Sequence, residues 1–135
     1  MRLRLLDLIA CPACQGALSC DPRRQDGDDV RSGLLSCKKC GGRFPIINVI
    51  PRLLPVSLAA GEQRTADAFG WEWREFQELH DDATYREQFL DWIQPVAPAE
   101  FRGKVVLDAG CGMGRFAIAA AQFGARDVLA VDLSE

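Results

Sequence analysis

The sequence predicts an α/β protein in which the start of a doubly wound parallel sheet follows a small β-rich domain. Residues 104–132 run in the order strand, glycine turn, helix, strand. Residues 1–56 hold two C-x-x-C pairs between short strand-like runs. We therefore expect three parts, namely the small β-rich domain at 1–56, a helical linker or cap at 57–103, and the first strand–helix–strand unit of an incomplete domain at 104–135.

The composition excludes a membrane protein. Of 135 residues 48% are hydrophobic and 26% are charged, and no apolar run reaches the roughly 18 residues that a membrane span needs. Asp7 interrupts the short apolar N-terminal stretch, which makes a signal peptide a poor match and favours a cytoplasmic protein.

The net charge of −3 is unevenly spread along the chain. Residues 1–60 hold nine Lys/Arg and five Asp/Glu, whereas residues 61–135 hold seven and fourteen. The favoured interpretation of this charge difference is that both parts simply have ordinary solvated surfaces. Docking of the two oppositely charged parts on each other, or RNA contact by the basic part, are the alternatives.

The first elements surround the two cysteine pairs. A short helix is expected at 3–9, strands at 17–20, 33–36 and 43–47, and a loop over the polar residues 21–32. Two C-x-x-C pairs separated by 22 residues have the spacing of a zinc site with four thiolate ligands, which are Cys11, Cys14, Cys37 and Cys40.

Such a site is structural. Tetrahedral zinc with four protein ligands has no open position for catalysis. Two disulfides or four free thiols are the alternatives, and disulfides are disfavoured in a cytoplasmic chain. Cys20 lies outside the ligand spacing and is expected to be a small buried or edge residue. A domain of this size can bury only a small apolar core. This zinc ribbon should therefore depend on its metal for folding.

Residues 3–55 resemble the small zinc-ribbon activator subunits of tRNA and protein methyltransferases. The resemblance rests on Leu5-Leu-Asp-Leu-Ile-Ala-Cys-Pro-Ala-Cys14, Leu35-Ser-Cys-Lys-Lys-Cys40, Phe44-Pro-Ile and Ile50-Pro-Arg-Leu-Leu54. Those subunits bind a catalytic partner by pairing strands and shielding apolar surface. The resemblance therefore implies that the ribbon docks on a methyltransferase domain, here in cis.

The middle part is expected to be helical. Phe69, Trp73 and Phe76 share one helical face, which Gly70 weakens, and Thr84-x-x-Glu87 has the pattern of a capping box that opens a second helix.

In the favoured interpretation the aromatic residues of the middle part belong to the core. The alternative is that Trp71, Trp73 or Tyr85 packs over a ligand. The single histidine, His80, precedes two aspartates. A solvated loop residue is the favoured interpretation of His80, and a general base is the alternative.

The glycine stretch carries the candidate cofactor site. Strands are expected at 104–107 and 128–131, with a helix at 115–123 between them. Alternate glycines allow positive φ angles and close approach of a ligand to the backbone. An acid about 20 residues further on can accept hydrogen bonds from ribose hydroxyls. The candidate cofactor-binding residues are Asp108, Gly110, Cys111, Gly112, Gly114 and Asp132.

Two cofactors compete for this motif. Gly112-x-Gly114-x-x-Ala117 satisfies the dinucleotide fingerprint. The fuller pattern, Asp108-x-Gly110-x-Gly112-x-Gly114, resembles the first motif of class I S-adenosylmethionine-dependent methyltransferases. That resemblance implies a Rossmann-like sheet, S-adenosylmethionine as cofactor and methyl transfer. A glycine turn that merely joins a strand to a helix is the structural alternative.

This resemblance covers only the start of a catalytic domain. Two strands and one helix cannot make a doubly wound sheet, so we expect an N-terminal part of a longer methyltransferase, with catalytic residues beyond 135. The rival hypotheses are a non-enzymatic ribbon that binds or activates a methyltransferase partner, and an NAD-dependent enzyme. The methyl acceptor is unknown. A small molecule is slightly favoured over RNA or protein because the sequence has no strong basic stripe.

Overall fold

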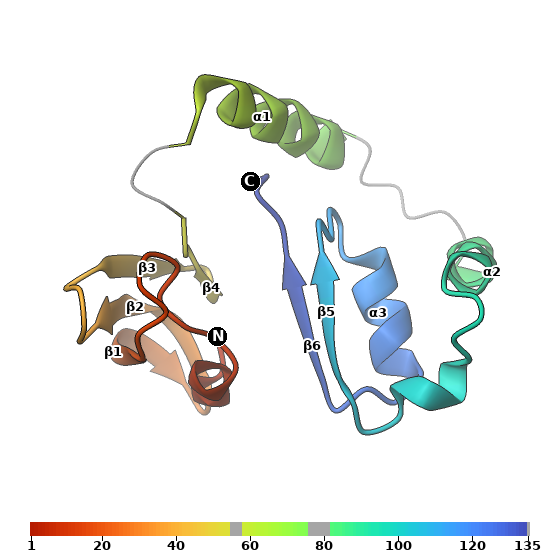
Figure 1. The fold of residues 1–135 in the computed structure, drawn as a ribbon, viewed down its shortest axis with the longest axis horizontal. Coiled ribbons are helices and arrows are strands. Elements are labelled where there is room, and N and C mark those ends of the chain that lie inside the picture. Colours follow the sequence, from red (N-terminus) through yellow and green to blue (C-terminus); the bar gives the residue numbers. More distant parts are fainter. Residues whose placement is uncertain (55–57, 76–81, 135) are drawn as a thin grey trace. The chain divides into compact units, whose positions relative to one another are not determined.

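The chain folds into two compact units, Met1–Ala59 and Ala60–Glu135 (Figure 1). The computed structural model describes residues 1–54, 58–75 and 82–134. The more detailed division at 1–56, 57–103 and 104–135 stays a prediction.

The first unit is a four-stranded antiparallel sheet whose strands follow the chain order (Figure 1). A short 3-10 helix, η1 (Leu3–Asp7), precedes the sheet and confirms the expected helical turn. The strands are β1 (Leu18–Asp26), β2 (Asp29–Cys37), β3 (Arg43–Ile47) and β4 (Ile50–Pro51).

The prediction of a loop at 21–32 was wrong. These residues extend β1 and β2 into a hairpin in which Asp26 pairs with Asp29 across a two-residue turn. Gly27 begins the turn with a φ of +57°, a conformation that glycine adopts without strain. β1 is an edge strand, where a proline such as Pro22 and exposed charges are tolerated, so its polar sequence resembles that of a loop.

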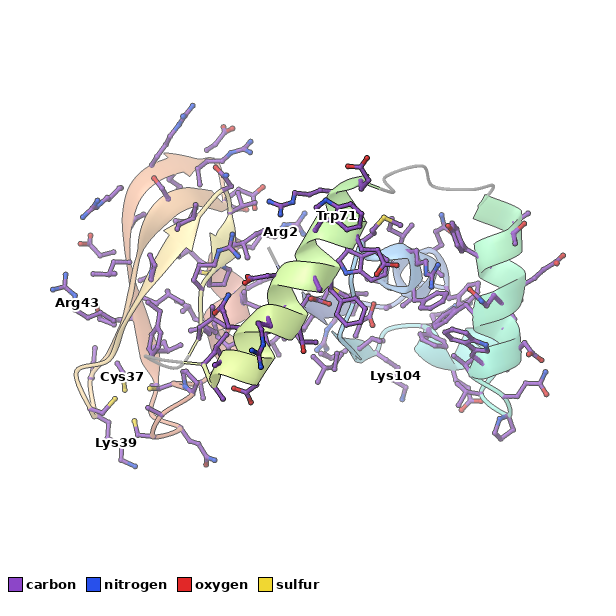
Figure 2. All side chains as sticks on the ribbon, turned by 90° about the horizontal axis from the view of Figure 1, so that it is seen from above. Arg2, Cys37, Lys39, Arg43, Trp71 and Lys104 are labelled. Carbon is purple, nitrogen blue, oxygen red and sulfur yellow. The ribbon has the colours of Figure 1, made fainter. Side chains whose placement is uncertain are left out.

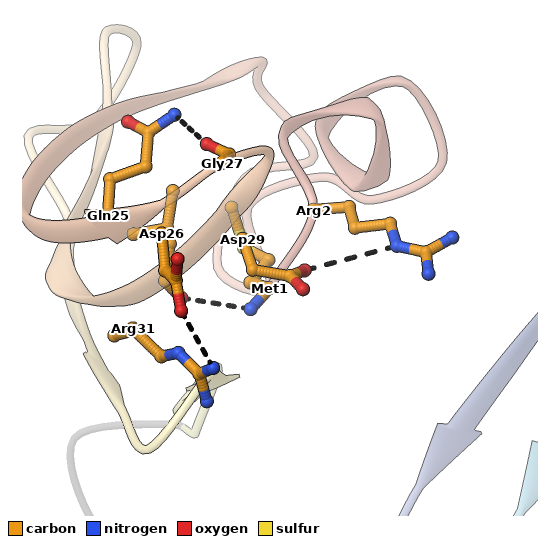
Figure 3. A network of polar contacts seen from close by, with 8 residues as sticks. Met1, Arg2, Gln25, Asp26, Gly27, Asp29 and Arg31 are labelled. Atoms are coloured by element: carbon orange, nitrogen blue, oxygen red, sulfur yellow. Dashed lines mark hydrogen bonds and ion pairs between the residues drawn. The ribbon is translucent and has the colours of Figure 1, made fainter.

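Polar contacts join the N-terminus to this hairpin (Figure 3). The α-ammonium group of Met1 donates a hydrogen bond of 2.9 Å to the carbonyl oxygen of Val30. Near the turn, the guanidinium group of Arg31 contacts the carboxylate of Asp26 at 3.1 Å. The N-terminal segment is thereby held against β2 and completes the core of the unit.

That core is small. Among the described residues it is formed by eight buried side chains, two of which belong to cysteines. This limited apolar core agrees with a domain that needs a further source of stability. The members are Met1, Cys11, Leu18, Val30, Leu35, Cys37, Phe44 and Ile46.

The second unit contains the expected strand–turn–helix–strand segment. Its two strands are parallel and pair from Val105 with Asp127 to Ala109 with Val131. In chain order its elements are α1 (Ala60–Glu75), α2 (Asp82–Trp92), η2 (Pro98–Phe101), β5 (Val105–Ala109), α3 (Arg115–Gln122) and β6 (Asp127–Val131).

α1 runs through Gly70 without a break, because one glycine costs only about 1 kcal/mol in a helix interior. One detail of the helical prediction was wrong. α2 begins at Asp82, so Thr84 lies inside the helix and cannot act as its N-cap. Phe76 and His80, which were assigned to a helical face and a loop, lie outside the described residues.

Stacked aromatic rings hold α2 against α3. The Phe89 ring lies 5.2 Å from that of Phe116 and 6.0 Å from that of Phe123. Phe101 of η2 packs against both Phe89 and Phe123. This cluster fixes α3, whose N-terminus follows the glycine turn directly.

Candidate functional site

Four cysteines of the first unit converge at one end of its sheet. Cys37 ends β2, and Figure 2 shows it beside Lys39 where sulfur atoms gather. The Sγ atoms of Cys11 and Cys40 are 3.6 Å apart, and those of Cys14 and Cys37 are 3.5 Å apart. All four sulfur atoms lie within 4.8 Å of one another.

This arrangement fits a tetrahedral zinc ion. Zinc–sulfur bonds of about 2.3 Å place ligand sulfurs about 3.8 Å apart, close to the observed separations. A disulfide would need about 2.0 Å between sulfurs, and all six cysteines are free. The sulfur geometry therefore favours a four-thiolate site over the disulfide alternative.

Two turns of the same design carry the ligands. The Cys11 N–H donates to the Gly16 carbonyl at 2.9 Å, and the Cys37 N–H donates to the Gly42 carbonyl at 2.8 Å. The glycines are needed for space, since a Cβ at Gly16 would approach the Cβ of Lys39 to 2.8 Å. Each C-x-x-C pair thus folds into a tight turn with both sulfurs on one side.

Cys14 and Cys37 have thiol groups of unlike pKa. A hydrogen bond from the Cys40 backbone N–H is the largest cause that lowers the pKa of Cys37, to about 6. The Gly16 N–H lowers the pKa of Cys14, but burial and the neighbouring thiols outweigh it and raise that pKa to about 12. Cys37 therefore loses its proton at a lower pH than Cys14 does, and a bound dication would favour the thiolate at every ligand.

The glycine turn joins β5 to α3 in the second unit. Gly110, Gly112 and Gly114 have φ angles of +79°, +50° and +80°, as the alternating pattern predicts. Gly114 is the N-cap of α3 in the left-handed conformation. The turn therefore presents its backbone at the carboxyl ends of the parallel strands, where α/β sheets bind nucleotides.

Asp132 closes this turn from the end of β6. Its carboxylate accepts hydrogen bonds from the Gly112 N–H at 2.7 Å and from the Ser134 N–H at 2.8 Å. Burial alone would raise the pKa of Asp132, but the hydrogen bonds from Ser134 and Gly112 hold it below its ordinary value. The group is therefore an ionised acceptor at neutral pH.

Asp108 and Cys111 lie close to the same turn. The Oδ2 atom of Asp108 is buried and has no hydrogen-bond partner within the described part of the chain. Burial, followed by the charges of Asp132 and Asp108, raises the pKa of the Cys111 thiol. Cys111 is thus a neutral, half-buried thiol, and Asp108 has an acceptor available for a ligand.

A cavity of about 530 Å³ opens beside the glycine turn, a volume typical of small-molecule sites. The sequence identified Gly110 and Asp132 as cofactor residues and left Trp73 as one of three aromatic candidates. Phe69 and Leu133 were not assigned to the site, although Phe69 lies on the same helical face as Trp73. The lining residues are Phe69, Trp73, Gly110, Val131, Asp132 and Leu133.

These features describe a ribbon with a four-cysteine cluster that fits zinc, followed by a parallel strand–turn–helix–strand unit. Residues 2–48 match the family model "Trm112p-like protein", and residues 88–135 match the model "Ribosomal protein L11 methyltransferase (PrmA)". Both predicted resemblances are confirmed by these matches. The chain combines a Trm112p-like ribbon with a methyltransferase-like segment.

Similar proteins include the ubiquinone biosynthesis O-methyltransferase of Neisseria meningitidis serogroup C (strain 053442), which is 39% identical over 72 residues. That match covers 53% of this chain but only 28% of the relative's length. A chain from a solved complex containing the Haloferax volcanii Trm112 methyltransferase activator is 33% identical. It is matched over 93% of its length and 41% of this chain, with a TM-score of 0.40.

The helices are too short or too polar to cross a bilayer. This statement covers the residues that the structure describes.

Proposed function

We propose that this chain is the N-terminal part of an S-adenosylmethionine-dependent methyltransferase with a fused structural zinc ribbon. The observation that carries the proposal is the link between the glycine turn and Asp132. Three positive-φ glycines lie at the carboxyl end of β5, and the Gly112 N–H donates to the carboxylate at the end of β6. The methyltransferase-like match over residues 88–135 supports it.

Each candidate residue has a chemical role in this proposal. Asp132 keeps unused lone pairs and would accept hydrogen bonds from the ribose hydroxyls. The buried Oδ2 atom of Asp108 would accept from the ammonium group of the methionine portion. Gly110, Gly112 and Gly114 leave the backbone open, and the neutral Cys111 thiol packs within the turn.

When bound, S-adenosylmethionine supplies an electrophilic methyl group. The residues described above would bind and orient it, and orientation of two reactants is a large part of such catalysis. The residue that would deprotonate an acceptor stays unassigned. A small-molecule acceptor and a cytoplasmic location, consistent with free thiols, are part of the proposal.

Substitution in the glycine turn tests the cofactor site. In the full-length protein, Gly112→Val should abolish S-adenosylmethionine binding in calorimetry, because a side chain there strains the turn and meets Trp73. Gly103→Val is the matched control, since Gly103 also has a positive φ of +71° but lies outside the cavity. Unchanged affinity in Gly112→Val would contradict the assignment.

A ligand competition separates this proposal from the NAD alternative. S-adenosylhomocysteine should displace S-adenosylmethionine, whereas NAD should not. Displacement by NAD at comparable concentration would favour the dinucleotide fingerprint over the longer methyltransferase motif.

The second candidate is a non-enzymatic ribbon that activates a methyltransferase partner, and the Trm112p-like match over residues 2–48 favours it. Exposed apolar side chains on the ribbon suit a docking surface, among them Ile47 and Ile50 at 47% and 51% exposure. Native mass spectrometry distinguishes the two. A protein that binds S-adenosylmethionine without a partner acts in cis, whereas binding that appears only with a second methyltransferase chain indicates an activator.

A further inference from the structure

Trp73 of α1 lies against the middle of the glycine turn. A Cβ built at Gly112 would come within 2.9 Å of the Cε2 and Cζ2 atoms of the indole and 3.3 Å of its Nε1 atom. Phe69, one helical turn earlier, stacks on Trp73 with ring centroids 6.1 Å apart and planes inclined by 18°. Both rings line the cavity that Asp132 also lines. α1 therefore provides an aromatic wall to the candidate cofactor site.

The charges around this wall suit a cationic ligand. The six described lining residues include one carboxylate, that of Asp132, and no cationic side chain. Asp108 adds a second carboxylate close to the turn, as its effect on Cys111 shows. Carboxylates and an aromatic face together stabilise a positive charge that has left water.

The order of groups in S-adenosylmethionine would place its charge beside the indole of Trp73. The sulfonium stands between the ribose and the methionine amino acid. With the ribose on Asp132 and the ammonium group on Asp108, as the proposed function has it, the sulfonium would lie between these two carboxylates, along the turn that contains Gly112. Trp73 contacts this residue of the turn.

We infer that Trp73 is a positioning residue that recognises the sulfonium by a cation–π contact and so distinguishes S-adenosylmethionine from the neutral product, S-adenosylhomocysteine. This inference rests on the proposed function. It assigns α1 to the cofactor site. It also explains why the product would bind more weakly than the cofactor, because the cation–π attraction ends when the methyl group leaves.

The test is calorimetric binding of both ligands to the full-length protein and to matched variants. Trp73→Leu should lose about tenfold more affinity for S-adenosylmethionine than for S-adenosylhomocysteine, since a partly desolvated cation–π contact is worth about one factor of ten. Trp73→Phe should keep most of the discrimination. Trp71→Leu, two residues away on the same helix, should leave it unchanged.

A fluorescence measurement avoids dependence on removing Trp73. The protein has three tryptophans, so replacing Trp71 and Trp92 by Phe leaves Trp73 as the reporter. Its emission should change more on binding the sulfonium ligand than on binding the thioether.

The outcomes separate the inference from the proposed function. Equal losses of affinity for both ligands in Trp73→Leu, with equal fluorescence changes, would overturn the sulfonium contact and leave the methyltransferase assignment standing. A folded wild-type protein that binds neither ligand would overturn both.

Discussion

At the scale of single residues, the two C-x-x-C turns differ in one strained position. Their backbone hydrogen bonds match, with Gln15 N–H donating to Cys11 at 2.8 Å and Gly41 N–H donating to Cys37 at 2.9 Å. Gln15 has a φ of +57° where the second turn has Gly41 at +75°. A side chain in the left-handed region costs about 1 kcal/mol, so the first turn bears a strain that the second avoids.

Gln15→Gly should therefore stabilise the protein. We expect the free energy of unfolding of the zinc-loaded protein to rise by up to about 1 kcal/mol, measured by denaturant titration. The reciprocal change, Gly41→Gln, should lower it by a similar amount. A loss of stability in Gln15→Gly would show that the glutamine side chain itself stabilises the turn.

The lowered pKa of Asp132 predicts a pH dependence of stability. Since its folded-state pKa lies below the ordinary 3.8, the carboxylate adds stability above that value and loses it as the pH falls through the lower folded value. Asp132→Asn should be less stable than the wild type at pH 5 to 7, and the difference should shrink below about pH 4. Denaturant titrations across this range, with Asp127→Asn as the control, measure it. A constant difference down to pH 2 would contradict the role of the charge.

At the scale of elements, the sequence predicts best where chemistry dictates the local pattern. Apolar runs around alternating glycines identify β5, α3 and β6 to within two residues. The cysteine spacing identifies the two turns whose sulfur atoms converge. The extension of β1 and β2 into a hairpin was not predicted, because the exposed edge strand has no alternation of apolar and polar residues. The contact between Trp73 and Gly112 was not predicted, because it joins two segments that are distant in sequence.

Removing zinc should unfold the ribbon selectively. Its strands share a core of eight buried residues among those described, which include the proposed ligands Cys11 and Cys37, so metal binding is expected to supply much of its folding energy. A strong chelator should abolish the amide protection of β1, β2 and β3 in hydrogen exchange and leave that of α2 and α3 intact. Acidification should have the same effect because protons compete with zinc for the thiolates. Persistent protection of β2 after verified zinc loss would show that the apolar core suffices.

At the scale of the whole molecule, one face of the parallel sheet has no cover among the described residues. α3 contacts both strands (Figure 1), and the half-buried residues of β5 alternate with exposed ones. Val105 and Leu107 are 43% and 65% exposed, whereas parallel sheets are normally buried on both faces. An apolar face of this kind supports the proposal that further elements of a methyltransferase sheet pack on it.

Leu107→Asp tests that expectation in the full-length protein. If the face is covered, a buried unpaired carboxylate should lower the free energy of unfolding by at least about 2 kcal/mol. Gln122→Asp, at an exposed position of α3, introduces the same charge and should change stability by less than about 0.5 kcal/mol. Denaturant titration of both variants gives the comparison. Equal, small effects would mean that the face stays in water, which fits an activator module better than a complete catalytic sheet. A large selective loss would mean that further structure covers this face, as the proposed methyltransferase sheet requires, because parallel sheets are normally buried on both faces.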